Sequence, residues 1–320
     1  MAKKLIRDFH EIFLDIYLIG YQTEGESIVC CLKTDDEISP FLFTSVIDCY
    51  RNEKFNYTVQ LLEKLNISKL DLLCWTHPDE DHTLGIDELI QKYVDNNTVV
   101  SIPISLLEHK ENFNKISQQC CNTILSRLKQ RKNANKIQLQ YTSNGMEVYS
   151  AEYLSKSQDK SYSLKIKALA PAAALIGNFL NRKTIENNIF SIALYLQFGM
   201  LNVLFTGDVE NNTIRALQNT WDLPNNFHYI KIPHHGSQSS SKFIDLLESQ
   251  KKPTFTGSTA CSTVFSKVGL PDKKILKRYD SIVRDVICTS DFIGESDAAI
   301  IYVRFDIDRK IYTITKMVSN

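Results

Sequence analysis

The residues with the clearest potential for chemistry form one short segment, His77-Pro78-Asp79-Glu80-Asp81-His82. The segment directly follows the apolar run LDLLCWT, which has the composition of a buried strand. In a loop at the end of a strand, alternate side chains can face the same side. His77 and Asp79 could therefore bind one cation, and Asp81 and His82 a second, because imidazole and carboxylate groups are common metal ligands.

Two other expected strands end in residues of the same kinds. LNVLFTG is followed by Asp208, and HYIKIP is followed by His234-His235-Gly236-Ser237. Ligand sites in α/β proteins gather beyond the carboxyl ends of strands, so we expect the three segments to converge. Their carboxylates and imidazoles are too many for one tetrahedral zinc but suit two cations about 3.5–4 Å apart. Taken singly, the segments could be a helix start, a turn and a surface loop; together they favour a metal centre.

The elements that must position these residues alternate between short apolar runs and helical patterns, which predicts an α/β architecture. Strands are expected at 11–20, 26–34, 41–49, 70–76, 98–104, 137–142, 147–154, 164–169, 191–198, 201–206, 228–233, 254–258, 285–289, 298–306 and 310–317. Helices are expected at 56–66, 85–94, 105–130, 210–220, 239–250 and 271–280. No linker rich in Gly, Ser or Pro divides the chain, which favours a single domain over 1–320. A helical, basic segment at 105–136 is either a solvated helix face or an arm that faces the substrate.

Composition excludes several classes of protein. The chain of 320 residues has 37 Lys and Arg against 37 Asp and Glu, which argues against a histone-like positive coat. It does not resemble collagen, a disordered chain or a disulfide miniprotein. No segment approaches the roughly 18 apolar residues that cross a bilayer. The 8 cysteines form no C-x-x-C pair, which is typical of reduced thiols. We therefore expect a cytoplasmic protein with no membrane part, with secretion as the alternative.

The segments THPDEDHTLG, FTGDVE and KIPHHGSQSSS resemble those of metallo-β-lactamase-fold hydrolases. Within that superfamily they are similar to the hydrolase domain of ComEC-type proteins, which carry H-x-D-x-D-H where most members have H-x-H-x-D-H. The resemblance extends to Asp48 and over nearly the whole chain. It implies a four-layer αββα sandwich with a dinuclear metal site at one edge of its two sheets. ComEC proteins span membranes, so this chain is expected to be a free-standing soluble relative.

The resemblance also implies a role for each residue that matches the motifs. His77 and Asp79 would belong to one metal ion, Asp81 and His82 to the other, and Asp208 would bridge them. One of His234 and His235 would complete the set. We favour His235 as the ligand and His234 as a residue behind it or in contact with a phosphate.

Asn188 and Ser191 match an N-x-x-S that this branch shows where other members place a further metal-binding histidine. They are candidates for substrate binding or for a turn and strand start. Ser237 could donate to substrate or cap the following helix. The sequence departs from the branch at three places: one glycine, Gly85, remains in a usually glycine-rich turn, Cys49-Tyr50 replaces a glycine, and Leu270-Pro271 replaces a His-Pro.

These residues imply hydrolysis by a metal-bound hydroxide, with zinc or manganese as the two divalent ions and Asp81 orienting the hydroxide. The ComEC resemblance and the basic stretches 127–136 and 273–278 favour a phosphodiesterase or nuclease acting on nucleic acid. Alternatives are a hydrolase of a small phosphodiester, lactone or thioester, and a metal-stabilised effector or interaction subunit controlled by a protein partner in a multi-subunit system.

Overall fold

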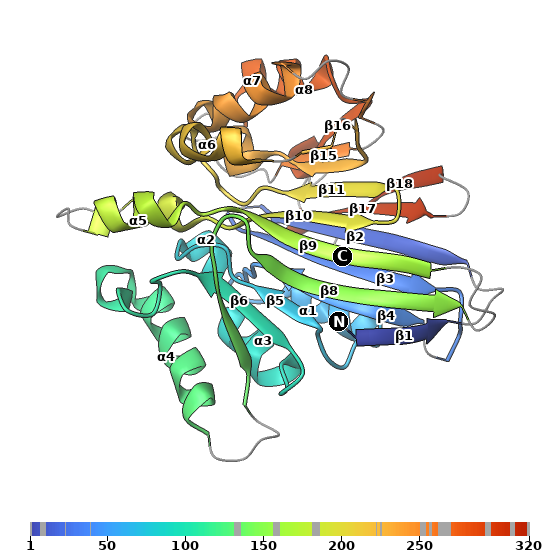
Figure 1. The fold of residues 1–320 in the computed structure, drawn as a ribbon, viewed down its shortest axis with the longest axis horizontal. Helices are drawn as coiled ribbons and strands as arrows, with labels where there is room; N and C mark the ends of the chain where they lie inside the picture. The colour runs from blue at the N-terminus through green and yellow to red at the C-terminus, as the bar shows by residue number, and fades with distance from the viewer. Residues whose placement is uncertain are drawn as a thin grey trace.

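The computed structural model describes residues 2–6, 11–22, 24–38, 40–130, 136–155, 161–180, 186–221, 223–224, 226–249, 254–255, 258–261, 270–291, 296–307 and 311–318. Over these residues the strands form two eight-stranded sheets and one two-stranded pair (Figure 1). We call the two large sheets sheet A and sheet B. Sheet A has the strand order β1-β8-β9-β10-β11-β13-β15-β16, and sheet B has the order β18-β17-β2-β3-β4-β5-β6-β7.

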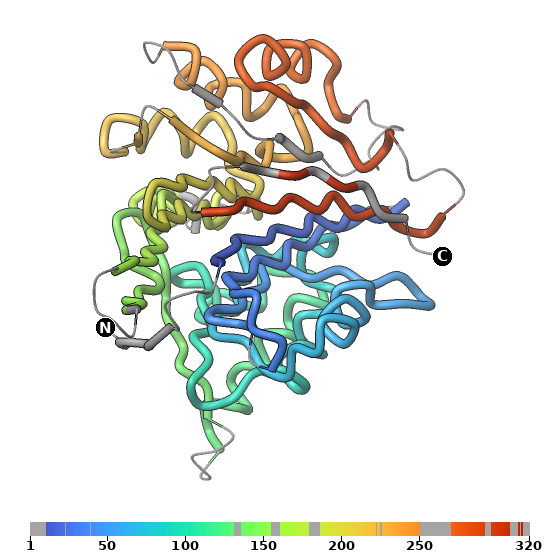
Figure 2. The backbone as a smooth tube through the Cα atoms, turned by 90° about the vertical axis from the view of Figure 1, so that its right-hand side faces the viewer, coloured from blue at the N-terminus to red at the C-terminus, as the bar shows by residue number. Residues whose placement is uncertain are grey.

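The strands of sheet A are β1 (Ala2–Ile6), β8 (Glu147–Ser155), β9 (Ser161–Ala170), β10 (Ala193–Phe198), β11 (Leu201–Phe205), β13 (Tyr229–Lys231), β15 (Ser258–Cys261) and β16 (Asp285–Cys288). Those of sheet B are β2 (Ile12–Tyr21), β3 (Glu26–Thr34), β4 (Phe41–Ile47), β5 (Leu72–Cys74), β6 (Val99–Pro103), β7 (Gln138–Thr142), β17 (Ala298–Asp306) and β18 (Ile311–Val318). The short pair is β12 (Asn226–Phe227) and β14 (Thr254–Phe255). Strand β17 lies antiparallel beside β2, which brings the last strands next to the first ones (Figure 2).

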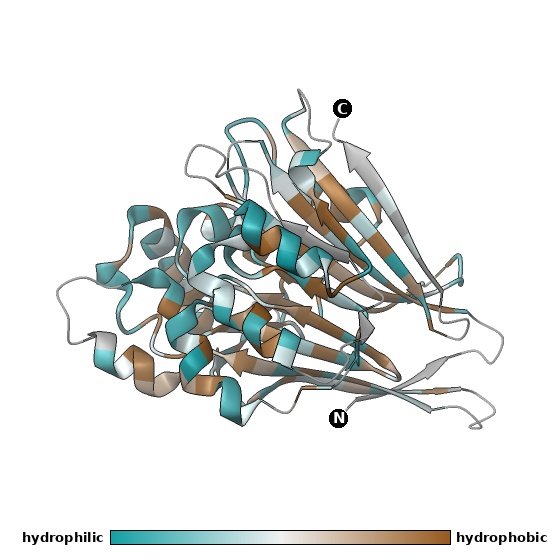
Figure 3. Cartoon of the chain, turned by 90° about the horizontal axis from the view of Figure 1, so that it is seen from above, coloured by the Kyte–Doolittle hydropathy of each residue, from teal (hydrophilic) through white to brown (hydrophobic). Residues whose placement is uncertain are grey.

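The period-2 alternation of strand side chains builds the core. In β2, Leu14 and Ile16 belong to the apolar cluster that contains Leu194 and Val203 of sheet A, so this cluster lies between the sheets. Tyr17, on the other face of β2, belongs to the cluster that includes the helices outside sheet B. The strands are correspondingly apolar while the outer helices carry polar residues on their exposed faces (Figure 3).

The helices lie outside the sheets. Leu62 of α1 (Tyr57–Lys64), Leu89 of α3 (Ile86–Tyr93) and Ile124 of α4 (Lys115–Lys129) pack on sheet B. Helices α6 (Asn211–Leu217), α7 (Ser241–Ser249) and α8 (Lys273–Asp280) pack on sheet A, on the other side of the molecule (Figure 1). The four-layer αββα sandwich that the sequence motifs implied is therefore confirmed.

Shorter helices connect these layers. They are α2 (Glu80–Thr83), α5 (Ala173–Leu180) and the 3₁₀ helices Lys110–Asn112, Asn187–Phe190, Gln218–Thr220, Pro233–Gly236, Gln238–Ser240 and Thr289–Asp291. None of the helices in the part of the chain that the structure describes has the length and apolar character that a bilayer crossing requires. The seven cysteines whose side chains are described are all unpaired and buried, as expected of reduced thiols.

The structure differs from the sequence-based expectation in a few elements. The helix expected at 105–130 begins only at Lys115, because the Asn114 side chain accepts a hydrogen bond from the Ser117 N–H at 2.8 Å and caps the helix there. Strand β1 and helix α5 were not anticipated. The strand expected at 254–258 includes 256–257, which lie outside the described residues.

Candidate metal centre

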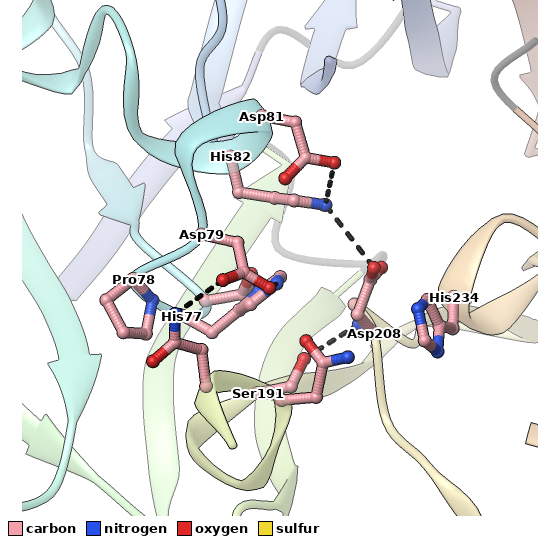
Figure 4. Close-up of polar contacts among 12 residues, drawn as sticks. His77, Pro78, Asp79, Asp81, His82, Ser191, Asp208 and His234 are labelled. Atoms are coloured by element: carbon pink, nitrogen blue, oxygen red, sulfur yellow. Dashed lines mark hydrogen bonds and ion pairs between the residues drawn. The ribbon is translucent and has the colours of Figure 1, made fainter. Parts of the chain in front are cut away.

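The topology brings the predicted ligands to one edge of the two sheets. Strands β4 and β5 run parallel, as do β11 and β13, so the loops that follow them emerge at corresponding ends. The loop after β5 carries His77 and Asp79 and leads into α2, whose first turn carries Asp81 and His82. The loop after β11 presents Asp208 from the other sheet, facing His82 (Figure 4).

Four side chains surround one point, and we call them the four-ligand group: Asp81, His82, Asp208 and His235. The Nε2 atom of His82 lies 3.5 Å from Oδ2 of Asp81 and 3.5 Å from Oδ2 of Asp208. The Nε2 atom of His235 lies 3.4 Å and 3.3 Å from the same two oxygens. Two ligands that are each about 2.1 Å from a tetrahedral cation lie roughly 3.4 Å apart. Each of these four histidine–carboxylate distances is compatible with a shared tetrahedral cation, and Asp81, His82 and His235 together form a cluster that could hold one.

A second, more open pair of ligands lies beside this group. Nε2 of His77 is 3.4 Å from Oδ2 of Asp79, and the ring centroid of His77 is 4.3 Å from that of His82. The other carboxylate oxygen of Asp79 accepts a hydrogen bond from Nδ2 of Asn187 at 2.6 Å. With only His77 and Asp79 as described ligands, a cation bound here would keep coordination positions for water or substrate, which is the property of a catalytic metal site.

Buried nitrogen atoms support the metal interpretation. Nε2 of His77 and Nε2 of His82 are both buried and have no hydrogen bond. Leaving such an atom unsatisfied costs about 1–3 kcal/mol, and most buried polar atoms have a partner. The donor set, its spacing and its unsatisfied nitrogens together fit a site for divalent cations.

Asp48 and Thr76 orient two of the imidazoles. Asp48 accepts hydrogen bonds from the Thr76 N–H at 2.7 Å, the Thr76 hydroxyl at 2.6 Å and Nδ1 of His82 at 2.8 Å. The Thr76 hydroxyl donates its single proton to Asp48. Its oxygen therefore accepts a hydrogen bond from Nδ1 of His77, 2.8 Å away. Both histidines therefore carry their proton on Nδ1 and offer Nε2 to a cation. Asp48 also clusters with these rings as a potential ligand, but its oxygens already accept three hydrogen bonds, so we assign it to positioning.

The Asp208 loop depends on a close backbone approach. Gly207 adopts φ +52°, and a Cβ atom there would lie 2.6 Å from the Ser191 Oγ and 2.7 Å from the Ile192 carbonyl oxygen. Glycine is therefore required at this position. Oγ of Ser191 accepts a hydrogen bond from the Asp208 N–H at 2.7 Å, and Ser191 is completely buried. This places Ser191 behind Asp208, where it positions the loop and has no surface to offer to substrate.

The side chains of the adjacent residues His234 and His235 point to different partners because the backbone is in the left-handed region at both residues. His234 has φ +48° and His235 has φ +49°, a conformation that non-glycine residues seldom adopt outside functional sites. His235 enters the four-ligand group. Nδ1 of His234 lies 3.0 Å from Oε1 of Glu210 and 2.7 Å from Oγ of Ser239. His234 remains partly exposed, at 21% of its side chain.

The remaining candidates for substrate binding lie around this second histidine. Nδ2 of Asn188 donates to Oε1 of Glu210 at 3.3 Å, so Asn188 helps to hold the Glu210 carboxylate. Oγ of Ser237 accepts from the Ser239 N–H at 3.2 Å and caps the following 3₁₀ helix. Both residues therefore have local structural partners at the rim of the site.

The carboxylates and imidazoles of the centre shift one another's pKa values. Burial alone would raise the pKa of Asp208, but Lys231, His235 and His82 hold the pKa of Asp208 well below its usual range. Burial would lower the pKa of His235, but Asp208 and Asp81 raise the pKa of His235 to about 9. The same competition, with Asp81 as the largest opposing charge, holds the pKa of His82 well above its usual range. The carboxylates thus stay ionised and available to a cation.

Sequence reasoning missed five residues at the site: Glu26, Thr76, Asn187, Glu210 and Lys231. Two of them carried a signal. Glu210 stands two residues after Asp208, and Lys231 interrupts an otherwise apolar strand. A lysine within a buried strand requires a charged or polar partner. Glu26 and Asn187 gave no such indication.

The two basic stretches lie at different places. The first turn of α4 contacts the ligand loop, because Oγ of Ser117 donates to the Pro78 carbonyl at 2.6 Å. Arg127 is one turn from the other end of this helix, about 15 Å away, and donates to the carbonyls of Ile90 and Val94 at 3.2 Å and 2.7 Å. Residues 131–135 lie outside the described part. Helix α8, by contrast, begins beside the histidine loop, with its capping residue Asp272 donating to the Gly236 carbonyl at 3.1 Å.

No protein-family model and no curated protein matches the chain. Among solved structures it is similar to CmlA, a diiron β-hydroxylase from Streptomyces venezuelae, at 11% identity and a TM-score of 0.45, covering 86% of this chain and 52% of that chain. It is similar to Zn²⁺-bound PqqB from Methylobacterium extorquens at 8% identity and a TM-score of 0.46, covering 85% and 97%. It is also similar to YhfI from Bacillus subtilis, described as a metallo-β-lactamase-fold protein, at 8% identity and a TM-score of 0.42, covering 86% and 96%. The chain thus spans about half the length of CmlA. At these identities and TM-scores no residue role passes from those proteins to this chain.

Proposed function

We propose that this chain is a metal-dependent hydrolase of phosphodiesters, with nucleic acid as its substrate. The observation that carries the proposal is the four-ligand group, whose four histidine–carboxylate distances of 3.3–3.5 Å are each compatible with a shared tetrahedral cation. The open His77–Asp79 pair beside it supplies a second place for a cation and a reacting water. Zinc and manganese both suit a set of imidazoles and carboxylates.

Bound divalent ions would lower the pKa of a shared water toward neutrality and offset the negative charge that develops on a phosphate. Within the chain, Asp81 contributes one carboxylate to the four-ligand group and is the candidate to orient the attacking oxygen. Asp79 keeps one carboxylate oxygen, since Asn187 engages only the other. Neither step requires a serine or cysteine nucleophile.

The Glu210–His234 pair supplies a proton donor at the rim of the site. Glu210 lies 3.0 Å from Nδ1 of His234, and His234 lowers the pKa of Glu210 against the opposing effect of burial. Glu210 thus stays ionised and keeps a carboxylate beside Nδ1 of His234. With Nδ1 engaged, Nε2 is the nitrogen left to pass a proton to the leaving oxygen of the substrate, as general acid catalysis requires.

The first turn of α8 favours an anionic substrate. Lys273, Lys274 and Lys277 are exposed on this helix, which begins beside the histidine loop. Arg278 of the same helix is paired with Asp245 and Glu248 and is not available to substrate. Exposed lysines near a reacting phosphate would contact neighbouring phosphates along a nucleic acid chain.

A small phosphodiester is the second candidate substrate. The position of Arg127, bound to α3 at the remote end of α4, favours it, because this part of the expected basic arm lies away from the ligands. The chain also has no excess of positive charge. A compact substrate would need only the contacts at the metal centre and at His234.

The test is hydrolysis of single-stranded DNA, double-stranded DNA, RNA and bis-p-nitrophenyl phosphate by purified protein, with manganese, with zinc and with EDTA. We expect EDTA-sensitive cleavage that is lost in Asp81→Asn and retained in Asp71→Asn, a carboxylate that binds the Thr44 N–H far from the site. Hydrolysis of the small ester without nucleic acid cleavage would replace nucleic acid by the second candidate. Metal-loaded protein that hydrolyses none of these would overturn the proposed function.

A further inference from the structure

A buried ion pair joins the two sheets directly beneath the four-ligand group. Nζ of Lys231, at the end of β13 in sheet A, lies 2.9 Å from Oε1 of Glu26, at the start of β3 in sheet B. Lys231 is fully buried and Glu26 is 2% exposed. Strand β3 runs antiparallel to β4, so the start of β3 lies at the edge where β4 ends and the ligands gather.

Lys231 holds the backbone and the side chain of the Asp208 loop at once. Its Nζ donates to the Gly207 carbonyl oxygen at 2.9 Å and to Oδ1 of Asp208 at 3.1 Å, in addition to Glu26. An ammonium group has three N–H donors, so these three acceptors use all of them. With Oδ1 held by Lys231, Asp208 offers Oδ2 to His82 and His235, the atom whose distances fit a shared cation.

Glu26 faces the remaining ligand with its other oxygen. Its Oε2 lies 3.7 Å from Nδ1 of His235 and is buried without a hydrogen bond. A carboxylate on this side favours the proton on Nδ1 and leaves Nε2 to a cation. Asp48 and Thr76 lie behind Nδ1 of His82 and of His77 at hydrogen-bond distance, 2.8 Å in each case, whereas Glu26 contacts His235 at ion-pair distance. Each of the three imidazoles thus has an acceptor behind it.

The energetics argue that the pair has a role beyond stability. Moving two charges out of water costs several kcal/mol per ion, and a well-packed apolar pair is often at least as stable. Glu26 and Lys231 together add no net charge to the centre. Their specific contribution is geometric, because one pair sets both the carboxylate oxygen of Asp208 and the tautomer of His235.

We propose that Glu26 and Lys231 are positioning residues that preorganise Asp208 and His235 to bind a divalent cation in the four-ligand group. The inference rests on the proposed metal centre but not on the identity of the substrate. Removing the pair is expected to weaken metal binding by about 10- to 100-fold, the range found when partners behind metal ligands are removed. The effect should fall on the four-ligand group and spare the His77–Asp79 pair.

The decisive variant is Glu26→Gln/Lys231→Met, which removes both charges and leaves the net charge unchanged, so that a change in affinity reports geometry. The matched control is Asp15→Asn/Lys33→Met. It removes a partly exposed ion pair in sheet B, with Nζ of Lys33 2.7 Å from the buried Asp15, which also binds the Arg304 guanidinium. Lys33 lies seven residues along β3 from Glu26, about 23 Å away. Glu26→Asp is a second variant that keeps both charges and withdraws the carboxylate by one methylene.

Zinc affinity is measured by competition with a chromophoric chelator, and ligand geometry by the visible absorption spectrum of bound Co²⁺. We expect a weaker affinity and an altered Co²⁺ spectrum in the double variant and in Glu26→Asp. The control pair should change thermal stability but neither metal readout. Folded variants with wild-type affinity and spectrum would overturn the inference and leave the metal centre intact. If the double variant does not fold, Glu26→Asp decides by the same readouts. A wild-type protein that binds no divalent metal would instead overturn the proposed function.

Discussion

The Nδ1 atom of His82 lies 2.8 Å from Oδ2 of Asp48, which precedes it by 34 residues and adopts φ +56° at the end of β4. The left-handed backbone turns the carboxylate back toward the end of β5, where it also accepts both hydrogen bonds from Thr76. One strained residue thus sets the orientation of two imidazoles, directly in one case and through Thr76 in the other.

Asp48→Asn should therefore weaken zinc binding by about 10- to 100-fold, because the amide can present its NH₂ group to Nδ1 of His82 and favour the wrong tautomer. Chelator competition measures the change. Asp71→Asn is the matched control, since its carboxylate accepts a hydrogen bond from the Thr44 N–H of a neighbouring strand. Equal affinities in wild type and Asp48→Asn would contradict this role.

Metal loading should occur in two steps of unequal affinity. The four-ligand group offers four donor side chains, whereas His77 and Asp79 offer two within the described part of the chain, so the first equivalent should bind more tightly. Native mass spectrometry of a zinc titration checks this order. His77→Ala should retain one tight equivalent, His235→Ala should lose it, and His228→Ala, a histidine outside the centre, should change nothing. Loss of the tight equivalent in His77→Ala alone would reverse the assignment.

Metal-free protein should lose stability as the pH rises. The carboxylates of Asp208 and Asp81 raise the pKa of His235 to about 9 in the folded state, against about 6.5 in an unfolded chain. A raised folded-state pKa contributes stability that is complete below about pH 6.5 and is lost as the pH passes through about 9. Thermal melting in EDTA measures this slope.

Bound zinc should remove that slope, because it takes the place of the proton on the imidazole. The loss of stability with rising pH should persist in His228→Gln, because burial lowers the pKa of His228 and this histidine does not contribute to it. The same loss should weaken in His235→Gln. A melting temperature in EDTA that stays constant or rises from neutral to alkaline pH would contradict the ion-pair arrangement.

Replacing His234 should separate catalysis from metal binding. Its Nδ1 is held by Glu210 and Ser239 and its ring lies outside the four-ligand group, so His234→Ala should keep the metal content. Turnover of a phosphodiester should fall by about 10²- to 10⁴-fold, the usual effect of a lost general acid. Glu210→Gln should cause a smaller loss, because Ser239 still contacts Nδ1 of His234. A parallel loss of metal would show that His234 is a ligand instead.

The buried thiols should resist alkylation in the native protein. Burial raises the pKa of Cys30 and of Cys49 to about 12, so roughly one thiol in 10⁴ is ionised at pH 8, and only the thiolate reacts. Mass spectrometry after iodoacetamide treatment should show these cysteines modified in urea and unmodified without it. Rapid native labelling of Cys30 would be inconsistent with its complete burial.

The convergence of the candidate ligands was predictable from the sequence because each of their segments follows an apolar strand, and parallel strands bring such loops to one edge. The most periodic elements were predictable for a similar reason: β2, β3 and β17 match the expected strands within a residue at most boundaries. Strand β1 was missed because Lys3 and Lys4 interrupt the apolar pattern of a short strand, which pairs with β8 at the end of sheet A as described.

Contacts between the sheets were not predictable from local pattern. In the sequence Glu26 is an ordinary polar residue at the start of a strand. Its ion pair with Lys231 forms only when β3 and β13 are brought together in the folded protein. The start of α4 at Lys115 depends on a capping contact by Asn114 that competes with a longer helical pattern upstream. Asn187 is significant only because the chain returns to Asp79 from more than a hundred residues away.

The ligands of the four-ligand group come from both halves of the sandwich, with Asp81 and His82 following sheet B and Asp208 and His235 following sheet A. A cation bound by all four would link the two sheets at one end. Elsewhere the sheets pack against each other through apolar side chains. Because a ligand bound only to the native chain stabilises it in proportion to the logarithm of its concentration, metal scarcity would open that end first. The abundance of the protein in a cell should then follow its metal supply through proteolytic turnover.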